Sequence, residues 1–507
     1  MKTNLAVLPF FIPLITAAFL YLVSNTKMLR NTFAMLSSLV QVFVSFIVLN
    51  TLKTQDLIFL PLGGWKVPYG ITITIDHISA VMIALCTIVS LVCVIYTLFE
   101  KKTSPIRLSL MQFIASGIVL SFATGDFFNL FVAFEIMLIS SYALMTLELS
   151  EKDTKYAFPY IAINLVGSAL FLGLGGLVYV FFGSLNFADI SNSALQIAGD
   201  QNLSIIAILM VAVFGLKAGM FPLFYWLPRS YSVLPYPLAA LFSAMLTKVG
   251  IYTLFRCLVT LMPHHLINIY DFILILSIPT MVIGIMGALY TKNMKEILCY
   301  NLVSHIGFMM VGIGIFSQDS LSAALFYAIH HIIVMGSLFL IIGIINQLQN
   351  SDNIDDCGGL WDKVPVLGLL FLLQALSLAG LPPFSGFWGK LLIIQASVKD
   401  GAILPLIAIV IASILTLLSL LRIWLAVFWG QNTAAEFNEK SPWSKMSYSV
   451  SILVAVSLII GLFPNRFIIY TETAIQNMLN QQKYIQPLMN YPGERFAEKY
   501  ESGKGHH

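Results

Sequence analysis

Charged residues are scarce in this chain. Lysine, arginine, aspartate and glutamate make up 10% of its 507 residues, whereas 58% are hydrophobic and the mean hydropathy is +0.88. Because soluble domains carry about 25% charged residues, this composition predicts an integral membrane protein. The net charge of +3 is small and most charges lie in loops between apolar segments, which argues against a nucleic-acid partner.

Cysteine is also rare, and its spacing argues against a metal centre. The cysteines form no CxxC pair, and four of the five lie in apolar segments, where cysteine behaves as a small hydrophobic residue. We therefore expect no cofactor, no zinc or iron–sulfur site and no disulfides. Walker, HExxH and nucleophile-elbow motifs are missing as well, so the sequence favours a transporter over an enzyme. The cysteines are Cys86, Cys93, Cys257, Cys299 and Cys357.

Long apolar runs recur along the whole chain. Runs of about 20 residues or more between polar turns are typical of membrane-spanning helices. We predict an all-α polytopic membrane protein with about fourteen transmembrane helices, the first of them an uncleaved span and not a signal peptide. The runs are 4–24, 31–52, 78–99, 107–125, 127–147, 156–183, 203–226, 236–262, 267–290, 294–316, 321–347, 364–396, 402–430 and 446–464.

The distribution of lysine and arginine predicts the orientation. If the N-terminus lies outside, thirteen basic residues fall in inner loops and only Lys53, Lys66 and Lys399 fall in outer loops between helices. Basic loops are enriched on the cytoplasmic side, so both termini are predicted to lie outside. The tail beyond Phe463 carries five more basic residues, which suggests a peripheral segment that packs on a partner.

Five basic residues remain inside predicted spans: Lys217, Lys248, Arg256, Lys390 and Arg422. A charge at bilayer depth costs roughly 3 kcal/mol on insertion scales and is usually functional. Since arginine does not release its proton, we interpret Arg256 and Arg422 as anchors or structural pairs. The three lysines are candidate proton carriers.

Glu135 is the one acid clearly placed within a span. It lies about nine residues into its helix, roughly 13 Å along the axis at 1.5 Å per residue, whereas Asp126 opens the same helix and is interpreted as a terminus residue. Glu135 is either a structural hydrogen-bonding carboxylate or the partner of an intramembrane lysine. We favour the second interpretation, with Lys217 as the partner.

Three histidines inside predicted spans offer a second kind of relay group, because imidazole titrates near neutral pH. They are His305, His330 and His331. A lone intramembrane histidine can also be hydrogen-bonded packing. His330 and His331 are neighbours on a helix and so about 100° apart, and we predict that they do not both face one path. Which of the three relays protons is left open.

Two proline-containing stretches form a faint repeat, "AGMFP" at 218–222 and "AGLPP" at 379–383. Proline removes a helical hydrogen bond and frees a carbonyl, which in a membrane must be satisfied by water or protein. Paired interrupted helices in two halves indicate a transport site near the midplane. Pro222, Pro382 and Pro383 are therefore the predicted helix breaks.

An ordered set of motifs resembles the Mrp-type sodium/proton antiporter subunits, which are related to the antiporter-like membrane subunits of respiratory complex I. The similarity covers nearly the whole chain, and the second motif below most resembles that of the D-type subunits. The motifs are "GGWKVPYGITITIDHIS", "GDFFNLFVAFEIMLISSYALM", "LKAGMFPLFYWLPRSYSVLPYPLAALFSAMLTKVGIY", "KNMKEILCYNLVSHIGFM" and "LAGLPPFSGFWGK".

The resemblance implies two inverted five-helix repeats, each with one broken helix, and a hydrophilic axis across the midplane. The implied division is 1–106 (three N-terminal helices), 107–262 (first repeat, helices four to eight), 263–430 (second repeat, helices nine to thirteen) and 431–507 (last helix and tail). Relatives often carry a lysine four residues after the central histidine, where this chain has Met335. The residues that the resemblance assigns to proton translocation are Glu135, Lys217, Lys248, His331 and Lys390.

The implied function is that of one subunit in a hetero-oligomeric antiporter of a bacterial cell membrane, in which inward protons drive Na+ efflux, with Li+ or K+ as alternative cations. Its partners would be other subunits and the lipid bilayer. Two alternatives stay open: a proton-pumping subunit of a complex I-like oxidoreductase, and a scaffold subunit whose buried charges only fix helix register. The sequence shows no cluster of oxygen ligands for sodium, so it does not specify whether Na+ passes through this subunit or a neighbour.

Overall fold

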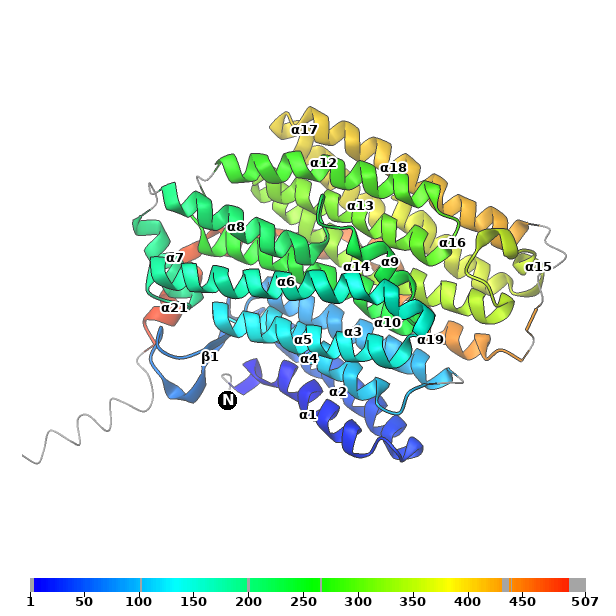
Figure 1. Ribbon diagram of the computed structural model, residues 1–507. Helices are drawn as coiled ribbons and strands as arrows, with labels where there is room; N and C mark the ends of the chain where they lie inside the picture. Colours follow the sequence, from blue (N-terminus) through cyan, green and yellow to red (C-terminus); the bar gives the residue numbers. More distant parts are fainter. Residues whose placement is uncertain are drawn as a thin grey trace, which may run out of the picture.

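The computed structural model describes residues 4–100, 103–197, 201–264, 267–430, 437–438 and 440–491, and these form a bundle of long, roughly parallel and antiparallel helices (Figure 1). Ten helices in this part of the chain are long and apolar enough to cross a membrane, and four shorter apolar helices occupy the other predicted runs. The all-α polytopic membrane fold is confirmed, whereas the count of fourteen spans stays a prediction.

The helices follow the apolar runs, with boundaries that differ from the predicted ones by several residues. They are α1 (Leu8–Leu22), α2 (Lys27–Thr51), α3 (His77–Phe99), α4 (Arg107–Ala123), α5 (Phe127–Glu148), α6 (Glu151–Phe182), α7 (Phe187–Gln196), α8 (Gln201–Ala218), α9 (Trp226–Ser232), α10 (Tyr236–Leu241), α11 (Thr247–Phe255), α12 (Ile267–Tyr290), α13 (Met294–Ile315), α14 (Gln318–Gln349), α15 (Leu360–Lys363), α16 (Pro365–Ala379), α17 (Ser385–Asp400), α18 (Ile403–Trp424), α19 (Trp443–Leu462), α20 (Pro464–Leu479) and α21 (Gln481–Met489). The π-helical segments η3 (Phe242–Leu246), η4 (Arg256–Leu261) and η6 (Leu425–Trp429) continue α10, α11 and α18.

Polar residues set the starts of several helices by capping open backbone N–H groups. The Asp76 carboxylate accepts from the Ser79 amide at the start of α3 (2.9 Å), and Asp126 accepts from the Asn129 amide at the start of α5 (2.8 Å). The interpretation of Asp126 as a terminus residue is therefore confirmed. Ser317 caps α14 in the same way.

The centre of the bundle is built from the helices that are buried all round. The segment Tyr236–Leu261 and α14 are fully buried over their most apolar stretch, and α13 is 94% buried, whereas α6 is only 28% buried. An apolar helix that is covered on every side belongs to the core of a large bundle. The charged side chain of Lys248 on α11 is therefore surrounded by protein, while α6 presents a broad outer face.

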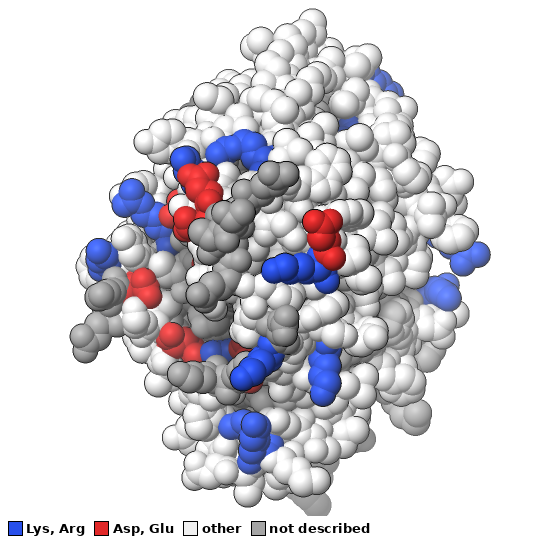
Figure 2. Space-filling view, turned by 90° about the vertical axis from the view of Figure 1, so that its right-hand side faces the viewer, with Lys and Arg blue, Asp and Glu red and all other residues white. Residues whose placement is uncertain are grey.

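One end of the bundle carries elements that the hydropathy pattern did not predict. Strands β1 (Ile58–Pro61) and β2 (Thr72–Ile75) form an antiparallel hairpin there, with Ile58 opposite Ile75. Helices α7 and α21 lie at the same end, as does the N-terminal end of the chain (Figure 1). Figure 2 shows the opposite end, where Lys, Arg, Asp and Glu are interspersed.

The segment after α19 packs on this chain, and its contact with a partner stays a prediction. The Tyr470 hydroxyl in α20 donates to the carbonyl of His77 (2.7 Å), and the Gln481 side chain at the start of α21 donates to the carbonyl of Thr260 (2.8 Å). Residues 492–507, the last part of that predicted tail, lie outside the described residues.

Candidate functional site

The first helix break follows directly after Lys217. Helix α8 ends at Ala218, Gly219 adopts a positive φ of 81°, and the Met220 amide donates back to the carbonyl of Gly215 (3.0 Å). This is the usual left-handed termination of a helix, for which glycine is favoured. Pro222 lies within the break, so the chain leaves α8 one residue after a buried lysine.

Lys217 is bonded to α6 and makes no ion pair within the described chain. Its Nζ donates to the Asn164 carbonyl (3.2 Å), to Asn164 Oδ1 (3.3 Å) and to Ser168 Oγ (3.4 Å). Glu135 is close enough to interact with the ammonium electrostatically, yet its Oε1 is buried without a hydrogen-bond partner in this part of the structure. Asn164 and Ser168 thus hold the ammonium, and the pairing of Glu135 with Lys217 stays a prediction.

The second break has the same form, but its lysine stands on the other side. Helix α16 ends at Ala379 and Gly380 takes a positive φ of 87° before α17 begins at Ser385, so Pro382 and Pro383 lie between them. Lys390, in α17, reaches back so that its Nζ donates to the Ala379 carbonyl (2.8 Å). A Cβ on Gly380 would lie 2.6 Å from the lysine Cδ, so only glycine leaves room for this contact.

Lys248 is fully buried on α11, immediately after the π-helical segment η3. Its Nζ donates to the Ser243 carbonyl (2.7 Å), inside that segment. Short π-helical segments within α-helices occur often at functional sites. Helix α11 also meets the first break directly: a Cβ on Gly250 would lie 2.6 Å from the Ala218 nitrogen. The absence of that side chain brings the Lys248 helix against the end of α8.

The histidines form a cluster between Lys248 and Lys390. The rings of His305 and His331 are 5.1 Å apart. His305 Nδ1 pairs with the Tyr327 hydroxyl (3.0 Å) and its Nε2 with Thr416 Oγ1 (3.3 Å). Both ring nitrogens of His331 are buried without a partner in the described chain. His331 lies within electrostatic range of both Lys248 and Lys390.

His330 and His331 face different neighbours, but they belong to one cluster. His330 Nδ1 pairs with Ser385 Oγ at the start of α17 (2.7 Å), on the Lys390 side. The Tyr327 ring lies 5.5 Å from the His330 ring and 6.2 Å from the His331 ring. The prediction that the two histidines do not both face one path stays a prediction, because both rings lie near that of Tyr327 while their other neighbours differ.

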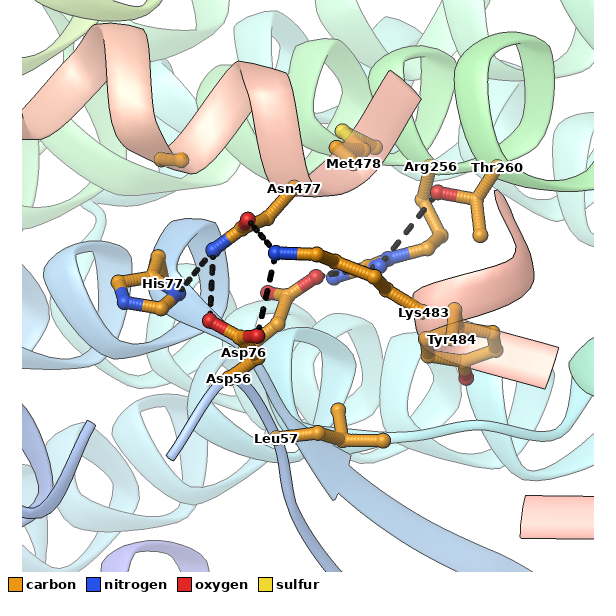
Figure 3. Close-up of a pocket in the computed structure, with 11 residues that line it drawn as sticks. Asp56, Leu57, Asp76, His77, Arg256, Thr260, Asn477, Met478, Lys483 and Tyr484 are labelled. Carbon is orange, nitrogen blue, oxygen red and sulfur yellow. Dashed lines mark hydrogen bonds and ion pairs between the residues drawn. The ribbon is translucent and has the colours of Figure 1, made fainter. Parts of the chain in front are cut away.

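Arg256 and Arg422 are held in fixed pairs. Arg422 donates to the carbonyls of Leu289 and, at 3.3 Å, of Thr291. Arg256 forms an ion pair of 2.7 Å with Asp76 at the end of the bundle that carries α20 and α21 (Figure 3). Burial alone would raise the pKa of Asp76. The charge of Arg256, its hydrogen bond and the hydrogen bonds from Ser79 instead lower this pKa to about 2. The interpretation of these arginines as anchors or structural pairs is confirmed.

Several residues that contact the candidate residues were not predicted from the sequence. Asn164 and Ser168 stand four residues apart within the apolar part of α6, so they share one face, and this spacing could have indicated them. Tyr327 is likewise four residues before His331. Thr416 and Ser385 give no such signal, because their contacts with the histidines join helices far apart in the sequence.

Comparisons with known proteins agree with this arrangement. The family model described as "NADH:quinone oxidoreductase/Mrp antiporter, TM" matches residues 124–416. The D subunit of the Na(+)/H(+) antiporter of Bacillus subtilis (strain 168) is 33% identical over 489 residues, 96% of this chain and 99% of that protein. The equivalently named protein of Alkalihalophilus pseudofirmus is 33% identical over 490 residues, 96% of this chain and 99% of that protein.

Solved structures show the same fold. A chain of the Mrp complex from Dietzia sp. DQ12-45-1b matches with a TM-score of 0.89 and 25% identity, over 96% of this chain and 99% of that one. A chain of the membrane-bound sulfane sulfur reductase, an archaeal respiratory membrane complex, matches with a TM-score of 0.87 and 26% identity, over 95% and 99%. A chain of respiratory complex I from Thermus thermophilus shares the fold (TM-score 0.81, 22% identity, 96% and 100%).

The helical membrane bundle with two interrupted helices and a buried row of lysines and histidines thus defines a polytopic membrane protein of transporter type. The chain belongs to the NADH:quinone oxidoreductase/Mrp antiporter family.

Proposed function

We propose that the chain is the D-type subunit of an Mrp cation/proton antiporter, a transporter and not an enzyme, in a bacterial cell membrane. It assembles with other membrane subunits and moves protons in exchange for Na+ or another monovalent cation. The observation that carries the proposal is the buried row of titratable side chains, Lys248, the histidine cluster and Lys390, in a chain 33% identical to a protein named as the D subunit of a Na(+)/H(+) antiporter.

In this proposal a proton passes from Lys248 to His331, on to His305 and then to Lys390. An ammonium can donate only to an unprotonated acceptor, and His331 has two ring nitrogens without a partner in the described chain. His305 accepts or donates according to its tautomer, since Tyr327 and Thr416 are both able to donate and accept. Met335 offers no titratable group, so the centre of the row relies on histidine.

Glu135 and Lys217 are proposed to control the row. Burial opposes the charge on the Lys217 ammonium, and the Glu135 carboxylate favours it. Because Asn164 and Ser168 hold the ammonium and no direct ion pair fixes the carboxylate, a small shift of Glu135 alters the balance. The close approach of Gly250 to Ala218 supports this proposal, because it brings the Lys217 end of α8 beside the Lys248 helix.

A line of polar groups on α6 supports proton access to Lys217 from one end of the bundle. Tyr156, Tyr160, Asn164 and Ser168 follow each other at four-residue intervals and so share one face of the helix. Tyr156 lines an open cavity of about 490 Å³ together with Asp153 and Arg229, and the other end of the line reaches Lys217.

The aromatic cluster around Tyr160 supports the same access route. The rings of Tyr142, Trp226 and Tyr231 lie 5.5–6.2 Å from Tyr160, and the polar atom of each of these three is buried without a partner in the described residues. Buried polar atoms of this kind are generally satisfied by water. We propose a hydrated passage here.

We propose that the end with the hairpin, α20 and α21 faces outward and the opposite end faces the cytoplasm. Both ends of the described chain lie at the first of these (Figure 1), as the predicted orientation requires. The inner loops would then carry most of the loop lysines and arginines, as membrane topology favours. The two breaks, one in 107–262 and one in 263–430, support the proposed division into two repeats.

The test is transport by the assembled complex. Everted membrane vesicles from cells that produce the whole complex should collapse a proton gradient when Na+ is added, and vesicles whose complex carries Lys248→Ala should not. Equal complex content in both must be verified by immunoblotting. Full activity of the Lys248→Ala complex would remove the row from the mechanism and favour the scaffold interpretation.

A second function is favoured by one observation, the TM-score of 0.87 with a chain of an archaeal respiratory complex. In that case redox chemistry in partner subunits would drive proton movement through this chain. Purification of the native complex separates the two functions. An antiporter complex carries no flavin or iron–sulfur absorption, whereas copurifying redox subunits would replace the antiporter assignment.

A further inference from the structure

A second open cavity lies at the end of the bundle that carries the hairpin, between the chain just after α2 and the first half of α20. It has a volume of about 520 Å³, and its polar lining includes Lys53, Thr54, Gln55, Arg466 and Thr473. It adjoins the closed cluster of Figure 3, with which it shares Asp56 and His77. The proton row does not use it.

The lining is positively charged and rich in donors. The side chains of Lys53 and Arg466 make no ion pair or hydrogen bond in the described part of the chain. Asp56, the acid on the wall, is already bound by Lys483 (3.2 Å) and Asn477 (3.0 Å), as Figure 3 shows. The Nε2 of Gln55 is buried and has no acceptor among the described residues. Two unpaired cations and an unused amide donor match a phosphate, which offers only acceptors and negative charge.

Apolar side chains lead from this cavity along the bundle. Helix α2 exposes a stripe that runs toward Lys53 and includes Phe43 (66% exposed) and Phe46 (53%). On the other wall, Ile469 of α20 is 61% exposed. In a membrane such a stripe faces acyl chains, and a basic residue at its end lies at headgroup level. A free phosphate ion would not contact the stripe. A phospholipid would bind the basic cavity through its phosphate and the apolar stripe through its acyl chains.

We propose that this cavity binds the phosphate of an anionic phospholipid, with Lys53 and Arg466 on the phosphate, Gln55 and Thr473 donating to its oxygens, and the acyl chains along α2. The site joins α2 to α20, and α20 covers the Asp76–Arg256 pair. A bound lipid therefore connects the first helices of the chain to its C-terminal helices. This inference is independent of the proposed transport function.

The test is photocrosslinking of the assembled complex in nanodiscs. The discs contain phosphatidylcholine with a tracer of photoreactive phosphatidylglycerol, and crosslinked peptides are identified by mass spectrometry. We expect crosslinks in 43–56 and 464–473. Removal of both cations in Lys53→Gln, Arg466→Gln should weaken competition by unlabelled phosphatidylglycerol roughly tenfold to thirtyfold, since each basic residue near a membrane surface contributes about 1 kcal/mol.

The matched control is Lys66→Gln, Lys399→Gln, which removes two exposed charges from the same end and should leave crosslinking unchanged. An equal loss of crosslinking in the control would show that the overall positive charge of this end attracts the lipid and that no specific site exists. That result would overturn the proposal. So would competition by inorganic phosphate as strong as that by phosphatidylglycerol, which would indicate an ion site. Crosslinks only to a neighbouring subunit would show that a protein fills the cavity, and would overturn it as well.

Discussion

Lys390 and Ala379 stand on opposite sides of the second helix break and are joined by a 2.8 Å hydrogen bond from Nζ to the carbonyl. The break leaves this carbonyl at the end of α16 without a helical donor, and the lysine supplies one. No acid pairs with the lysine among the described residues, and the Phe308 ring lies 5.1 Å from its nitrogen. A lysine held by neutral groups is free to exist in either protonation state.

The first prediction concerns that lysine. Lys390→Ala should stop antiport, and Lys390→Arg should not restore it, because arginine keeps the charge but does not release a proton. The measurement is the Na+-dependent collapse of a proton gradient in everted vesicles. Lys399, exposed on the same helix, is the control, and Lys399→Arg should be fully active. Wild-type activity in Lys390→Arg would mean that the site needs only a fixed charge.

The second prediction separates the histidines. His331→Ala should slow antiport by about a hundredfold or more, the size expected for loss of a proton-transfer group. His330→Ala should retain more activity, because its Nδ1 is bonded to Ser385 and it lies to one side of the His305–His331 contact. Initial rates at equal complex content give the comparison. The reverse order of rates would move the relay to His330.

The third prediction concerns Glu135 and Lys217, which we propose control proton transfer along the row. Glu135→Ala should leave the protein inserted but nearly abolish antiport, since it leaves the buried Lys217 ammonium without a nearby carboxylate. The double variant Glu135→Gln, Lys217→Gln should assemble well and remain inactive. Assembly is followed by native gel electrophoresis and transport in vesicles. Robust antiport by the double variant would show that the pair is structural.

The fourth prediction is a pH dependence of stability. Burial raises the pKa of Asp126 to about 6 from an ordinary value of 3.8. A carboxyl group with a raised folded-state pKa destabilises the protein once it ionises, so stability should fall as the pH rises from about 4 to about 6, by at most about 3 kcal/mol.

Asp126→Asn should remove this fall, because asparagine caps a helix as well as aspartate does. Thermal unfolding in detergent at pH 4.5 and pH 7.5 provides the measurement, with the variant more stable than the wild type only at the higher pH. A variant that is equally destabilised at both values would mean that the charge itself is needed at the start of α5.

The fifth prediction concerns the ion pair between Asp76 and Arg256. Arg256→Gln leaves the buried Asp76 carboxylate without its partner and should cost about 3–5 kcal/mol of stability. The double variant Asp76→Asn, Arg256→Gln should recover a large part of that loss. A double-mutant cycle on unfolding temperatures measures the coupling. Additive losses would show that each residue acts through other neighbours.

Much of the fold could be predicted because a membrane imposes a strong pattern on sequence. A run of about 20 apolar residues identifies a span without knowledge of its neighbours, and every predicted run holds a helix. The hairpin β1–β2, α7 and α20 could not be found in this way, because short elements at the end of a bundle have no such pattern. The left-handed glycines explain why the breaks fall at Gly219 and Gly380.

The candidate site was predictable in its charged members and not in their contacts. A lysine inside a span is conspicuous, so Lys217, Lys248 and Lys390 could be named from sequence alone. Their hydrogen-bond partners are mostly neutral, such as the Ser243 and Ala379 carbonyls, and a backbone carbonyl carries no sequence signal. The contact between His305 and His331 depends on how α13 and α14 pack, which helical periodicity does not specify.

The central claim is that protons move through the buried row, and direct measurement of proton flux tests it most sharply. The complex is reconstituted into liposomes with a pH-sensitive dye and Na+ inside, and is then diluted into Na+-free buffer. Outward Na+ should acidify the lumen for the wild type and for the surface control Lys399→Ala. A fully assembled Lys248→Ala complex should acidify the lumen no faster than empty liposomes. Acidification at the wild-type rate by that complex would contradict the account.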